Sequence, residues 1–204
     1  MTRLSTLLPG FFLLGGCVSL LPEPPPPPRV YVLEAGVVAP ADGAFVEAVI
    51  GVATPLGERS ILGTDMVWRS GDELAYVAQA QWSNRADAAL QSVLLETLIR
   101  QHRFTAATRV GEARGDYEVR WQVLDFEVVE SNRSARFSAD VTLIALPGRR
   151  IVAQAIIETE AAVADRTSSA VAEALARAAR EGSARIGMFA ADAAAQASAA
   201  SINR

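Results

Sequence analysis

The sequence predicts an α+β fold, a two-layer sandwich in which two main helices pack on one face of a mostly antiparallel sheet. Apolar and polar residues alternate through residues 117–123 and again through 137–145, the period of strands with one buried face. Leu90, Leu94 and Leu98 recur at helical spacing, and an alanine-rich amphipathic stretch closes the chain. Blocks of strands are thus separated by helices, as in α+β domains.

The first strands are predicted from β-branched and aromatic residues bounded by turn formers. Residues 30–33 and 45–52 are β-rich, and prolines and glycines break the chain around the second segment. Residues 61–69 and 73–79 flank Ser70-Gly71-Asp72, which is typical of a tight turn. We therefore expect these last two segments to form a hairpin.

The first main helix is expected from Asn84 to about His102. Asn84 is a favourable N-cap residue, and Asp87 places a negative charge in the first turn, where the helix dipole favours it. A short β-rich segment, residues 104–108, follows this helix.

Three longer strands are expected next, as an antiparallel meander. They occupy residues 117–128, 137–145 and 151–159, and Pro147-Gly148 turns the chain between the last two. Within the first strand the apolar positions slip by one residue. The slip predicts a bulge or a second buried face near Leu124.

The final helix is expected to begin near Asp165, Thr167 and Ser168, which are all good N-cap residues. We expect a single folded domain over residues 30–192, which is long enough to bury a real core. Residues 193–204 are expected to form a frayed tail.

The N-terminus has the pattern of a bacterial lipoprotein signal. Arg3 supplies a positive start, residues 4–14 are apolar but too few to span a bilayer, and Gly15-Gly16 precede the only cysteine. A lipoprotein signal peptidase needs small residues beside the scissile bond and a thiol that carries a diacylglycerol. Cys17 is therefore the predicted lipidation site, and residues 1–16 are the predicted signal peptide.

Acyl chains such as palmitate on Cys17 would anchor the mature chain durably. Retention in the inner membrane usually goes with Asp after the acylated cysteine, and this chain has Val18. We therefore expect the outer membrane, with the domain facing the periplasm. Residues 17–29 are the expected tether, because the proline run that ends at Pro28 favours an extended polyproline helix. A docking ligand for an aromatic groove is the alternative use of such a run.

Composition excludes several classes of function. The net charge is −4 and acidic and basic residues are interspersed, so no basic stripe indicates nucleic-acid binding. All 19 basic residues are arginine. Phosphate-binding loops with their lysine, Schiff-base chemistry and Ser-Lys catalysis are excluded, because each needs a lysine.

The inventory of catalytic residues is poor. His102 is the only histidine, and at a helix end a structural imidazole is the ordinary explanation. A zinc site would depend almost entirely on carboxylates, which is uncommon. Paired carboxylates remain an alternative for hydrolysis, and the candidates are Asp72, Glu73, Asp125, Glu127 and Glu130. We predict a protein that is not an enzyme, with no catalytic residues, cofactor or metal.

The three tryptophans offer a second kind of site. Trp68, Trp82 and Trp121 would suit a lipid or peptide groove, but large aromatic residues at strand and helix junctions are more often core. If one of them is the exception, we expect Trp68.

A series of short motifs follows the lipidation site in a recognisable order. They are Cys17, Tyr31-Val32-Leu33, Val52-Ala53-Thr54-Pro55, Gln81-Trp82 before the leucine helix, and Tyr117-Glu118-Val119 leading to Phe126. In this order, over about residues 30–190, the chain resembles the auxiliary lipoproteins of ABC-type transport systems. That family includes the paraquat-inducible lipoprotein, which works beside a periplasmic mammalian-cell-entry (MCE) domain protein. The long proline run and the lack of lysine depart from the family pattern.

The resemblance implies a non-enzymatic component of lipid transport between two membranes. Such a system is expected to have an inner-membrane permease, a cytoplasmic ATPase and an MCE protein that bridges the periplasm. The lipoprotein would dock the MCE protein at the outer membrane and meet the permease and ATPase only indirectly. Exposed sheet edges are the natural surface for pairing with a partner or with another copy, so a homo-oligomer is possible.

A regulator of a peptidoglycan synthase is the alternative from another class. Some outer-membrane lipoproteins place a small α/β domain on a proline-rich tether to reach such an enzyme, and the tether here fits that use equally well. The Tyr31-Val32-Leu33 start and the helix after Trp82 favour the transport interpretation.

Overall fold

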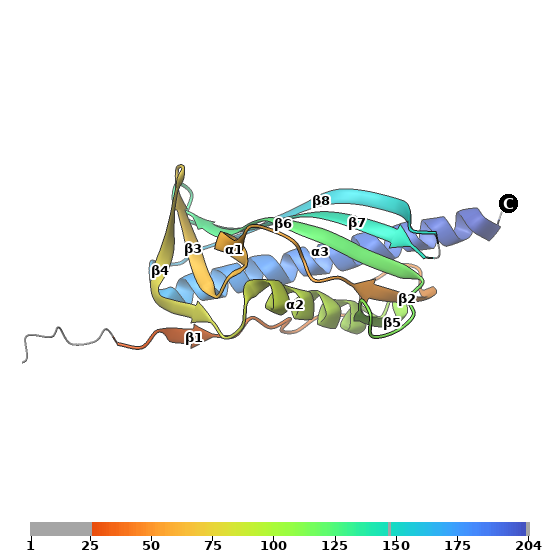
Figure 1. Ribbon diagram of the computed structural model, residues 1–204, viewed down its shortest axis with the longest axis horizontal. Helices are drawn as coiled ribbons and strands as arrows, with labels where there is room; N and C mark the ends of the chain where they lie inside the picture. The colour runs from red at the N-terminus through yellow and green to blue at the C-terminus, as the bar shows by residue number, and fades with distance from the viewer. Residues whose placement is uncertain (1–25, 147, 203–204) are drawn as a thin grey trace, which may run out of the picture.

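The structure is a computed structural model that describes residues 26–146 and 148–202. Within these ranges, eight strands form one open, mixed sheet, accompanied by three helices (Figure 1). The expected α+β class is confirmed. Cys17, the expected signal peptide and Pro147 of the expected turn lie outside the described residues.

Three long strands form the predicted meander. β6 (Tyr117–Val129) pairs antiparallel with β7 (Ser134–Ala145), and β7 pairs antiparallel with β8 (Arg150–Ala162). The register of β6 against β7 shifts between Val123 and Asp125, so the bulge expected at Leu124 is confirmed. The extra residue keeps apolar side chains on the buried face after the slip.

The other edge of β6 carries two short groups of strands. β2 (Val46–Val52) pairs in parallel with the start of β6 and is extended by β5 (Phe104–Arg109). β3 (Asp65–Ser70) pairs in parallel with the end of β6 and is extended by β4 (Glu73–Trp82).

β1 (Arg29–Tyr31) completes the second group by pairing in parallel with β4. The expected hairpin, β3 with β4, is present and antiparallel. The expectation of a mostly antiparallel sheet is not confirmed, because β1–β4, β2–β5, β2–β6 and β3–β6 are all parallel pairings. Parallel strands need long crossovers, and a strand's own side-chain pattern does not reveal its partner.

The short helix α1 (Arg59–Leu62) corrects the expected start of a strand at residue 61. Ile61 and Leu62 are buried from this helical turn, and β3 begins only at Asp65. A four-residue apolar segment is too short for its periodicity to separate helix from strand.

The first main helix is α2 (Ala86–Gln101), close to its expected range. Asp87 lies in the first turn as expected, but Asn84 is not the N-cap. The N-cap position falls on Arg85, and the Asn84 side-chain oxygen accepts a hydrogen bond from the Arg85 backbone N–H at 2.8 Å. The helix ends at His102, which takes the left-handed conformation with φ 54°.

The last helix, α3 (Ser168–Ile202), begins at the expected N-cap residues. The Thr167 hydroxyl accepts a hydrogen bond from the Ala170 backbone N–H at 3.3 Å. The frayed tail expected from residue 193 is wrong as far as Ile202, because the helix continues and Ala194 is fully buried. None of the described helices, α3 included, combines the length and the hydropathy that a membrane span requires.

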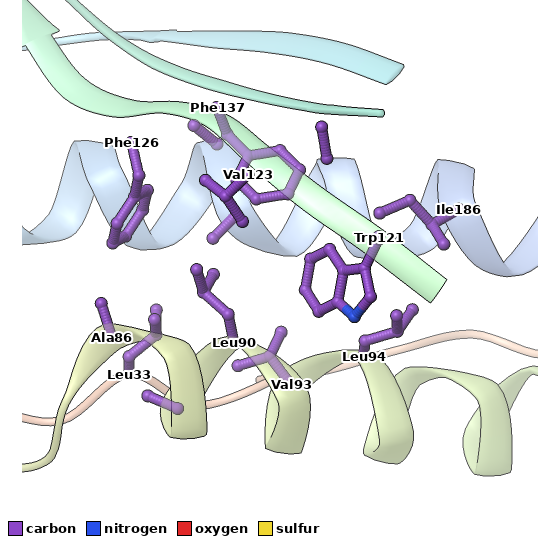
Figure 2. Close-up of a cluster of buried hydrophobic side chains, with 14 of the residues drawn as sticks. Leu33, Ala86, Leu90, Val93, Leu94, Trp121, Val123, Phe126, Phe137 and Ile186 are labelled. Carbon is purple, nitrogen blue, oxygen red and sulfur yellow. The ribbon is translucent and has the colours of Figure 1, made fainter. Parts of the chain in front are cut away.

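One core joins the sheet and the two main helices (Figure 2). Leu90 and Leu94 of α2 point toward Trp121 and Val123 of β6, and α3, which runs behind them in this view, contributes Ile186. Because α2 packs against α3 as well as against β5, a simple two-layer arrangement is not confirmed.

A glycine allows α3 to pack tightly against β7. A Cβ added at Gly182 would lie 2.3 Å from Cδ1 of the fully buried Phe137 ring. We expect Gly182→Ala to lower the free energy of unfolding by about 1–3 kcal/mol, because the clash outweighs the helix propensity gained. Urea unfolding measures the change. Glu181→Ala, at the neighbouring exposed position, should change stability by less than about 0.5 kcal/mol; equal midpoints for the two variants would contradict the prediction.

Candidate functional site

The first residues singled out from the sequence are the only cysteine and the only histidine. Cys17 lies outside the described residues, so its lipidation stays a prediction. His102 is exposed at the left-handed end of α2, which gives it a structural role in the chain reversal. Among the described residues, no group of three or more His, Cys, Asp or Glu side chains is arranged to hold a metal ion.

Two of the three tryptophans are core residues. Trp82 is 3% exposed and stacks on Phe126, with ring centroids 5.9 Å apart. Trp121 is 4% exposed, and its indole N–H donates to the Ala53 carbonyl at 2.8 Å. Trp68 is only partly buried but still packs against the core, and it is the most accessible of the three, so a role for it in ligand binding stays a prediction.

The half-buried Trp68 lies beside a cluster of charged residues. The Arg166 guanidinium lies 5.7 Å from the centroid of the Trp68 ring and makes an ion pair with Glu130 at 2.7 Å. A hydrogen bond from the Ser70 hydroxyl, followed by the charge of Arg166, holds the pKa of Glu130 below its usual value. Glu130 is therefore an ionised partner of Arg166, and not a general acid.

A second arginine neutralises the neighbouring carboxylate. Arg69 of β3 binds Glu127 of β6 through two hydrogen bonds, the second from Nη2 to Oε2 at 2.9 Å. Glu127 is 1% exposed, and its hydrogen bond to Arg69 raises the pKa of that guanidinium. This bidentate pair joins β3 to β6 on the face of the sheet opposite the core residue Phe126.

The five candidate carboxylates are not gathered at one place, and Asp125 lies on β6 beside the bulge, partly exposed. Glu127 and Glu130 lie together with Trp68, but each is paired with an arginine, whereas Asp72 and Glu73 lie at the far end of the hairpin. The two carboxylates beside Trp68 are therefore both engaged by arginines, which does not suit a general acid and base. Sequence reasoning missed Arg69 and Arg166. The outward position of Arg69 on an alternating strand was a usable signal, while nothing local marks Arg166.

The outer strand of the hairpin, β4, carries exposed apolar side chains. Leu74 is 40% and Tyr76 57% exposed, and a groove of about 320 Å³ lies between β4, Trp68 and Arg166. β1 pairs only with residues 80–82 of β4, so the outer edge of β4 before Gln79 has no strand partner among the described residues.

The opposite end of the molecule carries a second open surface. A groove of about 530 Å³ separates the start of β8 from the end of α3, and small residues line it. They are joined by one charged residue, Arg150. Ile151 and Ile156 of β8 are 60% and 62% exposed.

The outer edge of β8 is blocked over half its length. Arg177 of α3 donates to the Ala162 carbonyl at 2.8 Å, and Arg185 donates to the Glu158 carbonyl at 3.1 Å. The half of β8 that begins at Arg150 receives no such arginine among the described residues, so its edge is open to another strand.

The domain thus combines open strand edges and exposed grooves with two candidate carboxylates, Glu127 and Glu130, that are paired with arginines. The family model of the ABC-type transport auxiliary lipoprotein component matches residues 31–187. The chain belongs to this family, as its motifs had indicated, and the family's role in transport agrees with the expectation of a non-enzymatic component.

Solved structures support the fold. Protein XCC0632 from Xanthomonas campestris superposes with a TM-score of 0.78 at 20% identity, over 83% of this chain and 98% of that one. An uncharacterized protein gives a TM-score of 0.65 at 14% identity, over 80% of this chain and 99% of its own. At such identities the likeness concerns the fold alone. A comparison with curated protein sequences gave no match.

The charged cluster predicts a pH-dependent contribution to stability. Because the pKa of Glu130 is lower in the folded state, its contribution is present above the unfolded pKa of about 4.3 and is lost as pH falls through the folded pKa. Glu130→Gln should therefore unfold at lower urea than the wild type at pH 7, and the difference should shrink below pH 4. Ser70→Ala should reproduce much of this effect. Parallel pH profiles for wild type and Glu130→Gln would contradict the assignment.

Proposed function

We propose that this chain is the outer-membrane lipoprotein of an ABC transport system of the MCE type, and that it docks the periplasmic MCE protein there. The observation that carries the proposal is the membership of residues 31–187 in the auxiliary lipoprotein family. The lipidation pattern ending at Cys17 and the residue Val18 support an acylated protein on the periplasmic face of the outer membrane.

The arrangement of the two ends of the domain supports a docking role. β1, which receives the tether, lies at one end of the molecule, and the far end of α3 lies at the other (Figure 1). The unblocked half of β8 and the groove beside α3 are at the end away from the tether. A protein anchored through its N-terminus would present this end to the periplasm, where an extended segment of a partner can add to the edge of β8.

Site-specific photocrosslinking in cells tests the docking role. A photoreactive residue at Ile151 or Ile156 on β8 should capture an MCE-domain protein, identified by mass spectrometry. The same residue at Ile99, which is 50% exposed on α2, should capture much less. Capture of a peptidoglycan synthase from β8 would overturn the proposal in favour of the cell-wall regulator.

The anchor is tested by two substitutions at the predicted cleavage site. Cys17→Ser should abolish incorporation of labelled palmitate and leave the signal segment uncleaved, which gel mobility measures. Val18→Asp should keep the label but shift the protein toward inner-membrane fractions in a sucrose gradient. Palmitate labelling that survives Cys17→Ser would show that the anchor lies elsewhere.

A further inference from the structure

Two arginines of α3 cover the outer edge of β8 at a regular interval. Arg177 donates to the Ala162 carbonyl. Arg185 donates to the Glu158 carbonyl, eight residues further along α3 and four residues back along β8. Eight helical residues rise about 12 Å and four strand residues about 13 Å, so the two elements stay in step while they run in opposite directions.

The series ends where an alanine stands in place of the next arginine. The next contact would join position 193 of α3 to position 154 of β8, and these positions hold Ala193 and Gln154. Ala193 lines the groove between α3 and β8 together with Ala153, so this part of the helix does lie beside this part of the strand. An alanine side chain has no donor to offer a carbonyl. The edge of β8 is thus closed from Ala162 to Glu158 and open before it.

The open stretch of β8 presents the backbone groups of two residues. The backbone groups of successive strand residues point to opposite edges, and the Glu158 carbonyl points outward, because it meets Arg185. Ile156 and Gln154 precede it by two and four positions with no register shift between them, so their N–H and C=O groups also point outward. On that side neither backbone has a partner within the described part of the chain. One added strand would satisfy all four groups.

The two faces of an added strand would meet different surroundings. On the α3 side the strand would lie over the groove of about 530 Å³, whose lining includes the small residues Ala153 and Ala197. A groove of this size has room for large apolar side chains. On the opposite face of the sheet, the strand would lie beside Ile156, which is 62% exposed. A segment with large apolar residues at alternate positions, all pointing into the groove, therefore fits this edge.

The groove also contains a positive charge. Arg150 lines the groove, and it lies opposite Ala145 of β7, on the α3 side of the sheet. None of the ion pairs within the described part of the chain includes Arg150. A carboxylate of an added strand would make a charge-assisted hydrogen bond with it.

A second copy of β8 fits this edge poorly. On the groove side the open stretch of β8 carries Ala153 and Ala155, which lie opposite the buried Leu143 and Val141 of β7. These side chains are too small to fill the groove, and a second Arg150 would bring a like charge. The groove therefore favours a different partner, with larger side chains and an acid.

We propose that residues 150–157 of β8 accept an extended segment of the docked partner as an additional antiparallel strand. The segment points large apolar side chains into the groove at alternate positions and places a carboxylate at Arg150. The antiparallel direction is chosen because such pairing is slightly more stable per residue. The proposal rests on the docking role of the proposed function, and it defines the chemistry of the segment that the MCE protein supplies.

Amide hydrogen exchange of the purified full-length mature chain tests the added strand. The probe is a synthetic seven-residue peptide that begins with leucine, alternates leucine with threonine and ends in aspartate. With saturating peptide, we expect the N–H groups of Gln154 and Ile156 to exchange at least about tenfold more slowly than in the free chain. A peptide of the same composition with its leucines adjacent should give no protection.

The variant Ala193→Arg continues the arginine series and should close the open edge. An arginine at this position can reach the Gln154 carbonyl and fills the groove, so peptide affinity should fall at least about tenfold. Capture of the MCE protein by a photoreactive residue at Ile156 should fall equally. Ala199→Arg is the matched control, because Ala199 is exposed on the same helix but does not line the groove. Equal urea midpoints for the two variants verify that both are folded.

The charge is tested by an exchange of partners. Arg150→Glu should weaken binding of the peptide that ends in aspartate, and a peptide that ends in arginine should restore it. Equal affinity of the two peptides for the wild type would contradict the role of Arg150.

Several results would overturn the added strand. They are an absence of protection in the wild type, equal protection by the peptide with adjacent leucines, and undiminished protection in Ala193→Arg. Protection of Gln154 that rises with protein concentration, without peptide, would assign the edge to a second copy. MCE capture that survives Ala193→Arg would refute the added strand and leave the docking role intact. Peptide protection without MCE capture in cells would support the strand site and refute the docking role.

Discussion

The double pairing of β6 is the constraint on which the rest of the structure depends. One edge of this strand pairs with β7 along nearly its whole length, while the other edge receives β2 at its start and β3 at its end. Its buried face supplies Trp121, Val123 and Phe126 to the core between α2 and α3. β6 thus positions both groups of short strands, including the β3–β4 hairpin. The bulge at Leu124 keeps the apolar side chains of both halves of β6 facing the core.

Arginine supplies the second set of constraints, which fits a chain without lysine. The segment after β1 crosses the helices without regular structure, and its carbonyls accept hydrogen bonds from guanidinium groups. Arg180 binds the Glu34 carbonyl, Arg100 binds the Gly36 carbonyl, and the buried Arg103 binds the carbonyls of Asp42 and Ala44. A planar group with five donors can hold several acceptors at once, which an ammonium on a flexible stem does less well. The tether is thereby joined to the core through more than the three residues of β1.

Sequence reasoning succeeded where a structure depends on neighbours along the chain. The alternation before Val123, the slip at Leu124 and the caps before α3 are local patterns, and each predicted its element. The parallel pairing of β2 and β3 with β6 depends on contacts between distant segments, so nothing local revealed it. The same limit applied to the candidate site: Trp68 was named as the tryptophan to watch, but Arg166, which lies against its ring, is 98 positions further along the chain. The tail beyond residue 193 was misjudged because alanines look featureless in sequence, although they allow α3 to pack closely.

The edges of the sheet are protected unevenly: some stretches are blocked against pairing with another strand, and one stretch of β8 is open. An unpaired edge invites association with other strands, and proteins usually block it with charge or cover it. Here Arg177 and Arg185 block the second half of β8, and the proline run ends where β1 would otherwise extend along β4. The first half of β8 has neither protection, lies beside the groove against α3, and carries the exposed Ile151 and Ile156. Because the chain blocks one half of this edge with arginines and leaves the other half open, the open half is best explained as a surface that a partner covers.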